Sequence, residues 1–163
     1  MPLHDALEHH ASQDVSIALL DAHLPATKHA NKRNLLPLSS VMVNGSDTDV
    51  LLFEKILKAY PEGAKHKSTD GSVPLHEAMY KKLPFRITEL LIEAYPEACA
   101  VVGGPNKSLP IHWAVYRSTE KVFEGEKVIK LLISKNKDGL KAKEKDGCIA
   151  LHNALYGCSL ELL

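Results

Sequence analysis

The sequence predicts an all-α protein, a solenoid of about five stacked helix-turn-helix units, from three observations. A short motif close to Pro-Leu-His-x-Ala recurs along the chain at intervals of 35 to 40 residues, which is the spacing of a repeat architecture. Small and apolar residues in each copy fall three to four positions apart, as on one buried face of a helix. A second apolar segment of helical period follows each of the first four copies.

The motif marks where each unit begins. Units start near residues 2, 37, 74, 110 and 150, and we expect a single array over residues 1–163 whose last unit is incomplete. Proline opens four of the five copies, and it suits the first turn of a helix because its missing N–H is not needed there. One apolar column of the motif should be buried between units: Leu3, Leu38, Leu75, Ile111 and Leu151.

The second helix of each unit is predicted from segments that align without gaps. Two of them end in Ala-Tyr-Pro-Glu, and proline cannot continue the helix, so each helix should end just before it. Turn-rich stretches such as Lys-Ser-Thr-Asp-Gly-Ser follow and should form loops with hairpin tips. The aligned segments are 15–23, 52–60, 87–95 and 128–136, and their first buried column should be Val15, Leu52, Ile87 and Val128.

These units resemble ankyrin repeats over nearly the whole chain. The Thr-Pro-Leu-His-x-Ala signature of that family is matched at residues 73–78 and 109–114, and shorter copies stand at 2–6 and 150–154. The chain departs from the family in its longer spacing, in the apolar residues that replace threonine, and in Ser39, which takes the histidine position of the second unit. The resemblance implies a non-catalytic protein-interaction scaffold that binds its partner on a concave face of inner helices and loops.

The resemblance also implies a structural role for the motif histidines, which in that family hydrogen-bond backbone groups of adjoining loops and tie units together. The alternative is a catalytic base or a metal ligand. A catalytic residue need not recur in every unit, and no carboxylate or nucleophile stands at a fixed offset from these histidines. The histidines assigned to the repeat motif are His4, His76, His112 and His152.

Candidate partner-binding residues come from the columns beside the motif and from the loops. The column after the histidine is mixed in character, as a recognition surface should be, and another column places tyrosines on three successive units. Exposed grouped aromatics favour partner binding, whereas packing of the tyrosines between units is the alternative, and both remain open. The candidates are Glu77, Tyr80, Trp113, Tyr116, Arg117, Asn153 and Tyr156 on helices, and Thr69, Asp70, Lys145 and Asp146 at loop tips.

Composition and charge argue against several other functions. Twenty basic residues balance twenty acidic ones, so no basic surplus is present for general nucleic-acid binding. No apolar run approaches the roughly 20 residues of a membrane span, and the polar first ten residues do not resemble a signal peptide. Three cysteines at irregular spacing fit a reducing compartment, so we expect a cytoplasmic protein that binds another protein.

We expect neither a cofactor nor a metal. Cys148, His152 and Cys158 lack the paired cysteine spacing of a structural zinc site, the lysine-rich residues 135–147 are interpreted as a solvated loop, and residues 103–105 lack the lysine of a phosphate loop and should form a turn. Two alternative functions are a histidine- or metal-dependent hydrolase near His152, and the scaffold part of a larger multidomain signalling protein.

The ends of the array raise one more expectation. Solenoids need polar caps, because each internal unit leaves an apolar face open, and residues 158–163 should fall within a second helix of the last unit. We therefore expect association through the uncapped ends, with Leu160, Leu162 and Leu163 as apolar contacts.

Overall fold

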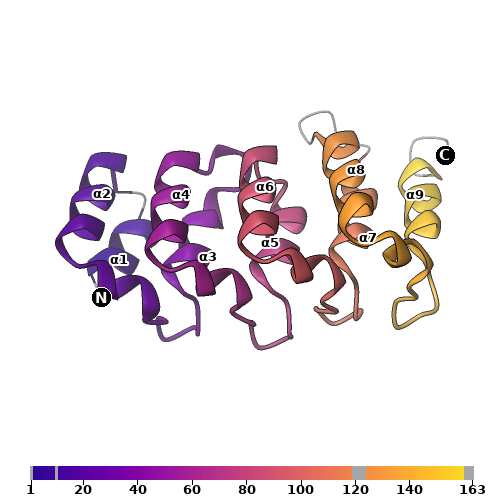
Figure 1. Ribbon diagram of the computed structural model, residues 1–163, viewed down its shortest axis with the longest axis horizontal. Helices are drawn as coiled ribbons and strands as arrows, with labels where there is room; N and C mark the ends of the chain where they lie inside the picture. Colours follow the sequence, from indigo (N-terminus) through magenta and orange to yellow (C-terminus); the bar gives the residue numbers. More distant parts are fainter. Residues whose placement is uncertain (1, 10, 119–123, 160–163) are drawn as a thin grey trace.

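The computed structural model describes residues 2–9, 11–118 and 124–159, and within these residues the regular structure is helical apart from one isolated β-bridge between Gly103 and Ser108. The all-α prediction is therefore confirmed. Helices pair along the chain and the pairs stack side by side along the long axis of the molecule (Figure 1). Each helix contacts its equivalent in the next pair, as α5 does with α7 and α4 with α6.

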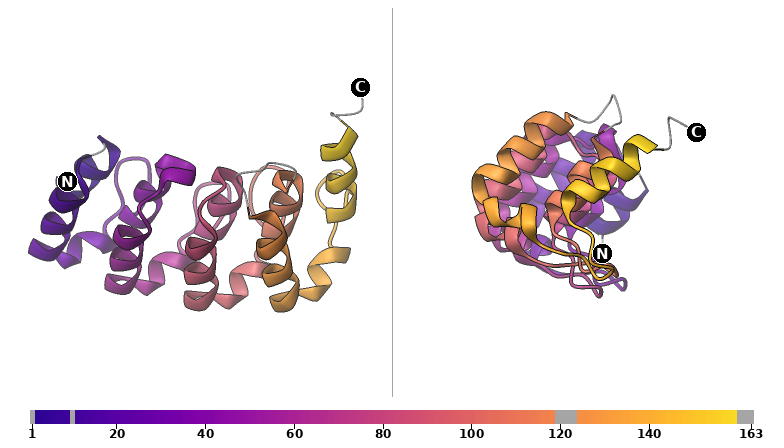
Figure 2. Two further views of the ribbon diagram at one scale, coloured as in Figure 1. Left: turned by 90° about the horizontal axis from the view of Figure 1, so that it is seen from above. Right: turned by 90° about the vertical axis from the view of Figure 1, so that its right-hand side faces the viewer.

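Two rows of helices result, as the view from above in Figure 2 shows. The first row holds the motif helices, each of which starts at the residue that the repeat predicts. It consists of α1 (Pro2–Glu8), α3 (Pro37–Val41), α5 (Pro74–Lys81), α7 (Pro110–Arg117) and α9 (Ala150–Ser159). The second row consists of α2 (Gln13–Ala22), α4 (Val50–Ala59), α6 (Phe85–Ala94) and α8 (Gly125–Lys135).

A short 3-10 helix follows each helix of the second row, where sequence analysis expected only a turn. Both Ala-Tyr-Pro-Glu helices end before the proline as predicted, but the chain then winds one tighter turn, with Gly63 N–H donating to the Tyr60 carbonyl and His66 N–H to the Gly63 carbonyl. These helices are η1 (Leu24–Lys28), η3 (Pro61–Lys65), η4 (Pro96–Ala100) and η5 (Lys137–Lys141), and η2 (Met42–Asp47) extends α3. The lysine-rich segment is thus partly helical, which corrects its interpretation as a loop.

The core lies between the two rows and between successive pairs. Side chains from the predicted columns fill it, among them Leu38, Leu75 and Ile87 at 2% exposure or less. The columns fail at two positions of the outer units, where Val15 is 49% exposed and Leu151 is 64% exposed, because no neighbouring pair among the described residues covers them. Leu3 of the first unit is buried as predicted. Cys158 belongs to α9, the first helix of its unit, and not to a second helix as expected; Leu160, Leu162 and Leu163 lie outside the described residues.

The loops that enter the motif helices share one turn, in which one residue adopts the left-handed conformation. Asn34, Gly71 and Gly147 occupy this position with φ of 58°, 82° and 88°, a region open to glycine and asparagine. Lys107 takes the same position in the loop before α7, with φ of 53°. Residues 104–107 form a turn, which overlaps the turn predicted at residues 103–105 and carries Lys107 where the other loops carry glycine or asparagine.

Lys107→Gly is expected to raise the free energy of unfolding by about 0.5 to 1 kcal/mol. Glycine adopts the left-handed conformation without strain, and the relief of strain exceeds the conformational entropy that glycine loses on folding. Urea unfolding measures the change. Lys67→Gly is the control, since Lys67 lies in the preceding loop without a positive φ and should lose stability. Equal effects of the two substitutions would contradict the assignment of strain to Lys107.

Candidate functional site

Four predicted residues gather on the first row of helices and form what we call the aromatic cluster: Tyr80, Trp113, Tyr116 and Arg117. The Trp113 ring meets Tyr80 edge-on at 5.4 Å between centroids and Tyr116 at 6.4 Å. The guanidinium carbon of Arg117 lies 5.2 Å from the Tyr80 ring centroid and 5.6 Å from that of Tyr116. The cluster therefore joins α5 to α7 across two units.

The tyrosines of this cluster both pack and face solvent. Tyr80 is 53% exposed and Tyr116 is 43% exposed, whereas Trp113 is half-buried against the core. Edge-to-face aromatic pairs and a guanidinium beside aromatic rings are each favourable by about 0.5 to 1 kcal/mol. The tyrosines thus pack on Trp113 and also keep part of their surface exposed, and partner binding at this cluster stays a prediction.

The other predicted helix residues have partners of their own. The Lys81 ammonium lies 2.6 Å from the Glu77 carboxylate, one turn along α5. Asn153 Nδ2 donates to Glu144 Oε2 at 3.0 Å, so Asn153 connects α9 to the loop before it. Tyr156 belongs to α9, but its side chain lies outside the described residues.

The predicted loop-tip residues Thr69, Asp70, Lys145 and Asp146 are all exposed. The two carboxylates hold their own turns: Asp70 Oδ1 accepts from Ser72 N–H at 3.0 Å, and Asp146 Oδ1 accepts from Cys148 N–H at 3.1 Å. The hydrogen bond from the Ser68 hydroxyl lowers the pKa of Asp70, and the backbone N–H of Cys148 lowers that of Asp146. Both carboxylates are therefore already engaged within the chain.

Successive loops are also bonded to one another. Gly104 N–H donates to the Asp70 carbonyl at 3.1 Å, and Lys145 N–H donates to the Asn106 carbonyl at 2.9 Å. The Ser108 hydroxyl donates to Glu144 Oε1, a residue that sequence analysis took for part of a solvated loop. The loops extend together beneath the first row of helices in the end-on view of Figure 2, so they form a continuous edge beside it.

The motif histidines make the backbone hydrogen bonds that their structural role requires. His76 Nδ1 accepts from the N–H of Val73, the residue before α5, and His76 Nε2 lies 3.1 Å from the Ser108 carbonyl in the next loop. His112 repeats this geometry with Leu109 N–H and the Ala142 carbonyl. Each histidine ring thus satisfies the N–H of the residue before its helix and ties its unit to the next, while Val73 and Leu109 give no side-chain cap to the first-turn N–H groups.

The outer copies of the motif keep part of this arrangement. His4 Nε2 lies 3.1 Å from the Leu35 carbonyl, and His152 Nδ1 accepts from Ile149 N–H at 3.0 Å while the side chain stays exposed. Sequence analysis missed one further link between loops, in which His66 Nε2 lies 2.9 Å from the Asn34 carbonyl. His66 stands outside the motif, so the repeat pattern gave no signal for it.

The buried histidine predicts a pH dependence of stability. Burial lowers the pKa of His76 below its ordinary value of 6.5, so the unfolded chain binds a proton more readily than the folded one. The stability that the chain gains from an uncharged His76 should therefore be complete above about pH 6.5. The free energy of unfolding should fall as the pH drops below that value. Urea unfolding at pH 7.5 and pH 5.5 measures the change, and His76→Gln should shrink it; an undiminished change in that variant would exclude His76 as its source.

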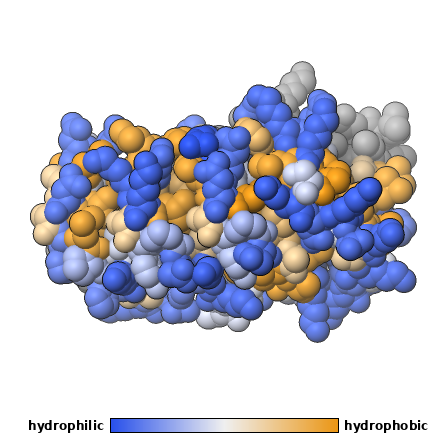
Figure 3. Space-filling view, viewed as in Figure 1, coloured by the Kyte–Doolittle hydropathy of each residue, from blue (hydrophilic) through white to orange (hydrophobic). Residues whose placement is uncertain are grey.

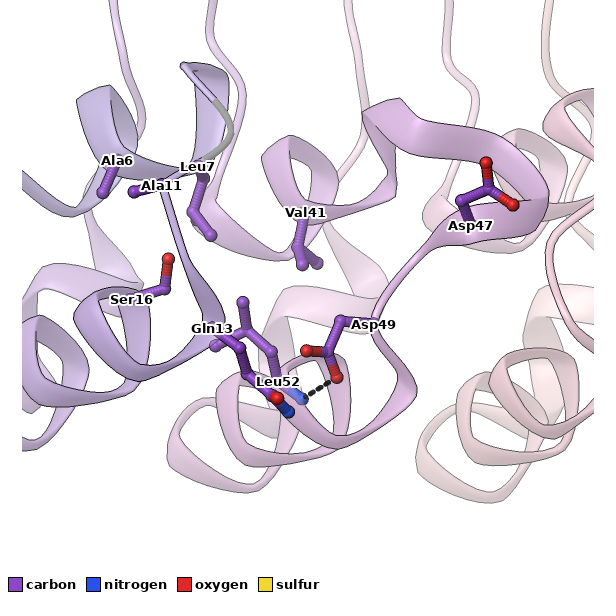
Figure 4. Close-up of a pocket in the computed structure, with 9 residues that line it drawn as sticks. All are labelled: Ala6, Leu7, Ala11, Gln13, Ser16, Val41, Asp47, Asp49 and Leu52. Carbon is purple, nitrogen blue, oxygen red and sulfur yellow. Dashed lines mark hydrogen bonds between the residues drawn. The ribbon is translucent and has the colours of Figure 1, made fainter.

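A small pocket of about 80 Å³ lies between the first two helix pairs (Figure 4). Of its two carboxylates, Asp47 and Asp49, the second accepts from Leu52 N–H at 3.0 Å and so caps α4. No histidine or cysteine lines the pocket. The lining residues are Ala6, Leu7, Ala11, Gln13, Ser16, Val41, Asp47, Asp49 and Leu52.

The remaining candidates for chemistry are isolated from one another. Burial raises the pKa of the Cys99 thiol to about 11, so Cys99 stays protonated and unreactive at neutral pH. In the part of the chain that the structure describes, no three histidine, cysteine or acidic side chains group in a way that would hold a metal ion. The side chain of Cys158 lies outside that part.

The outer face shown in Figure 3 is mostly hydrophilic, with apolar patches between the charged rows. Ion pairs such as Lys58–Glu54 and Lys130–Glu126 run along the helices of the second row. Among the described residues, no helix has both the length and the apolar character needed to cross a membrane. Exposed aromatic and cationic side chains instead meet on the first row, in the aromatic cluster.

Comparison with known proteins gives a structural match. No family model and no curated protein matches the sequence. Among solved structures, the chain is similar to a chain in the complex of the predatory endopeptidase Bd0816 from Bdellovibrio bacteriovorus with the immunity protein Bd3460. The match has a TM-score of 0.68 and 16% sequence identity, and it covers 98% of this chain and 93% of that chain. The fold of stacked helices therefore occurs over a similar length in a known structure.

Proposed function

We propose that this chain is an ankyrin-like repeat solenoid that binds a protein partner on the face formed by its first-row helices and its loops. The observation that carries the proposal is the aromatic cluster, in which Tyr80 and Tyr116 stay largely exposed beside the Trp113 anchor. Tyrosine, tryptophan and arginine are the residues that most often dominate binding energy at protein interfaces. They also bring large contact areas at a small entropic cost, because aromatic side chains have few torsions.

The histidine geometry supports this role over the alternative of a histidine-dependent hydrolase. The Nδ1 atoms of His76, His112 and His152 each accept a backbone N–H, so the lone pair of that nitrogen is already used within the chain. The similar solved structure is a complex between two proteins, which accords with a binding role and identifies no partner for this chain.

Affinity capture from the cell extract with the wild-type chain, followed by titration of the purified captured protein, tests the proposal. Trp113→Ala should weaken binding tenfold or more, about 1.4 kcal/mol or above. Tyr95→Ala is the matched control, since Tyr95 is an aromatic residue on the side of the second row, where Lys65 lies over its ring. Equal weakening by both variants, or by neither, would contradict the proposed surface.

A further inference from the structure

The surface around α9 is apolar and accessible, unlike the junctions inside the array. Helix α9 stands at the end of the first row (Figure 1), where it packs against α7 and η5. Among the described residues, no second-row helix follows it. Five apolar residues around this position are exposed or only partly buried, and we call their surface the notch: Ile129 and Ile133 of α8, Leu140 of η5, and Leu151 and Leu155 of α9.

Each notch residue occupies a position that the third unit buries. Leu151 is 64% exposed, whereas Leu75 at the same motif position is buried. Leu140 is 37% exposed, whereas Cys99 at the same position of η4 is buried. The counterparts of the other three notch residues are also buried in the third unit: Met79, Thr88 and Ile92. The notch is therefore the same kind of surface that the interior junctions cover.

Inside the array, a second-row helix covers this surface, and its carboxyl end lies on the 3-10 helix of the preceding unit. Asn136, at the end of α8, donates through Nδ2 to the Cys99 carbonyl at 2.9 Å. The Lys65 ammonium of η3 lies 5.8 Å from the ring centroid of Tyr95, at the end of α6. Lys141 holds the position of Lys65 in η5 and is exposed. The end of one more helix would therefore meet Lys141.

The notch has the shape of a place for one helix. A complete helix pair does not fit, because α9 already occupies the first-row position beside it. A second copy of this chain offers no single helix, since each of its second-row helices packs against a motif helix. We infer that the notch is an interaction surface apart from the aromatic cluster, and that it binds one amphipathic α-helix of a partner protein in the place of a second-row helix.

The interior helices specify the chemistry of this partner helix. Helix α6 buries Ile87, Leu90 and Leu91, which lie three to four positions apart, and it ends at Tyr95. A helix in the notch needs the same apolar face toward α8 and α9. An aromatic residue at its carboxyl end would lie under Lys141, in the cation–π contact that Lys65 makes with Tyr95.

Charge on the second row adds a preference. Arg86, in the first turn of α6, acts on Glu54 of the preceding helix α4. The pKa of Glu54 is lowered, mainly by Lys58 on the same helix and further by Arg86. The first turn of a second-row helix thus presents its charge to an opposite charge on the helix before it.

The same relation joins α8 to α6, and it leads to Lys130 in the notch. The pKa of Lys127, in the first turn of α8, is raised mainly by Glu124 and further by Glu89 on α6. Lys130 holds the position of Glu89 in α8, and like Glu89 it also has a partner on its own helix, Glu126 at 2.5 Å. We therefore expect an acidic residue in the first turn of the partner helix, where it faces Lys130.

A peptide with the sequence of residues 84–97, which is α6 with its flanks, tests the inference. A covalent link between the side chains at positions 89 and 93 holds it helical, as circular dichroism can verify. Fluorescence anisotropy with the full chain should show saturable binding. The peptide with Arg86→Glu should bind about threefold more tightly, which is within the range of exposed ion pairs, and Lys130→Glu in the chain should reverse that preference.

Two matched variants of the chain locate the binding. Leu151→Asp should weaken peptide binding tenfold or more, because it puts a charge into the apolar notch. Aspartate suits the first turn of a helix, so α9 should stay folded. Leu51→Asp is the control, since Leu51 is likewise the second residue of a helix and 52% exposed, but it lies on α4. It should leave the affinity unchanged.

The remaining outcomes count against the inference. Absence of saturable binding by both peptides, or equal losses in Leu151→Asp and Leu51→Asp, would overturn it. An unchanged preference in Lys130→Glu would overturn the acidic first turn. Sedimentation velocity of the chain alone tests the other occupant: self-association that Leu151→Asp abolishes would assign the notch to a second copy. None of these variants alters the aromatic cluster, so the proposed function is tested separately.

Discussion

Replacing Gly103 with alanine should lower the free energy of unfolding by about 3 kcal/mol, the range of substitutions that overpack a tight site. A Cβ atom at this position would lie 2.7 Å from Ser72 Cα and 3.0 Å from Ser72 N, both of them backbone atoms of the preceding loop. Gly103 and Ser108 also exchange two backbone hydrogen bonds at 2.9 Å, which hold the loop in place. The contact cannot be relieved by a side-chain rotation, so the loops must separate.

Urea unfolding of Gly103→Ala measures this effect, with Gly63→Ala as the control. A Cβ on Gly63 would meet only side-chain atoms, the nearest being Leu38 Cδ2 at 3.4 Å, which is ordinary van der Waals contact. Gly63→Ala should therefore change stability by less than about 1 kcal/mol. Similar losses in the two variants would show that the close approach of successive loops does not restrain the fold.

His76→Ala should cost about 1 to 3 kcal/mol, because it leaves the buried N–H of Val73, at the start of α5, without a partner. It also removes one of the two hydrogen bonds at the carbonyl of Ser108, in the next loop, which keeps its bond from Gly103 N–H. His76 is only 3% exposed, so water cannot replace the ring at either group without opening the junction. Any effect on partner binding should follow the loss of folded protein and nothing more.

His152→Ala provides the comparison for His76→Ala within the same motif. His152 is exposed and makes the local bond to Ile149 N–H, where water can substitute, so its loss should cost no more than about 0.5 kcal/mol. Urea unfolding of His76→Ala and His152→Ala measures the two losses of stability. A loss of binding by His76→Ala with an unchanged unfolding midpoint would mean that His76 acts on the partner itself.

The unit starts and the histidine contacts were predictable because they depend on local chemistry. Proline stands at the first position of α5 and α7 and favours a helix start there. The apolar period identifies the face that packs on the next unit. A histidine repeated at one position of every unit but the second signals a role in stacking, and the bonds of His76 and His112 match it.

Other features were hidden because they depend on contacts between units. The 3-10 helices that follow Tyr60 and Tyr95 are single short turns, and such turns lack an apolar period long enough to recognise. Glu144 gains its partners Ser108 and Asn153 only when three segments meet. Leu151 is exposed because of its place in the array, although it has the same motif position as buried residues such as Leu38 and Leu75.

The position of Arg117 shows the same limit within the candidate site. The sequence places it next to Tyr116, but its guanidinium lies nearer to the ring of Tyr80, on the neighbouring unit. Only the stacking of α7 on α5 brings these residues together, and that stacking turns a column of tyrosines into a cluster. The site was therefore predictable as a set of residues, and its geometry was not.

Tyr116→Ala tests the central claim most directly, when urea unfolding and affinity for the captured partner are measured on the same protein. Tyr116 is 43% exposed and contacts Trp113 and Arg117, so its truncation should remove interface area and leave the core intact. The account predicts a tenfold or greater loss of affinity with an unfolding free energy within about 1 kcal/mol of wild type. A large loss of stability with unchanged affinity of the folded fraction would contradict it and make the cluster a packing element between units.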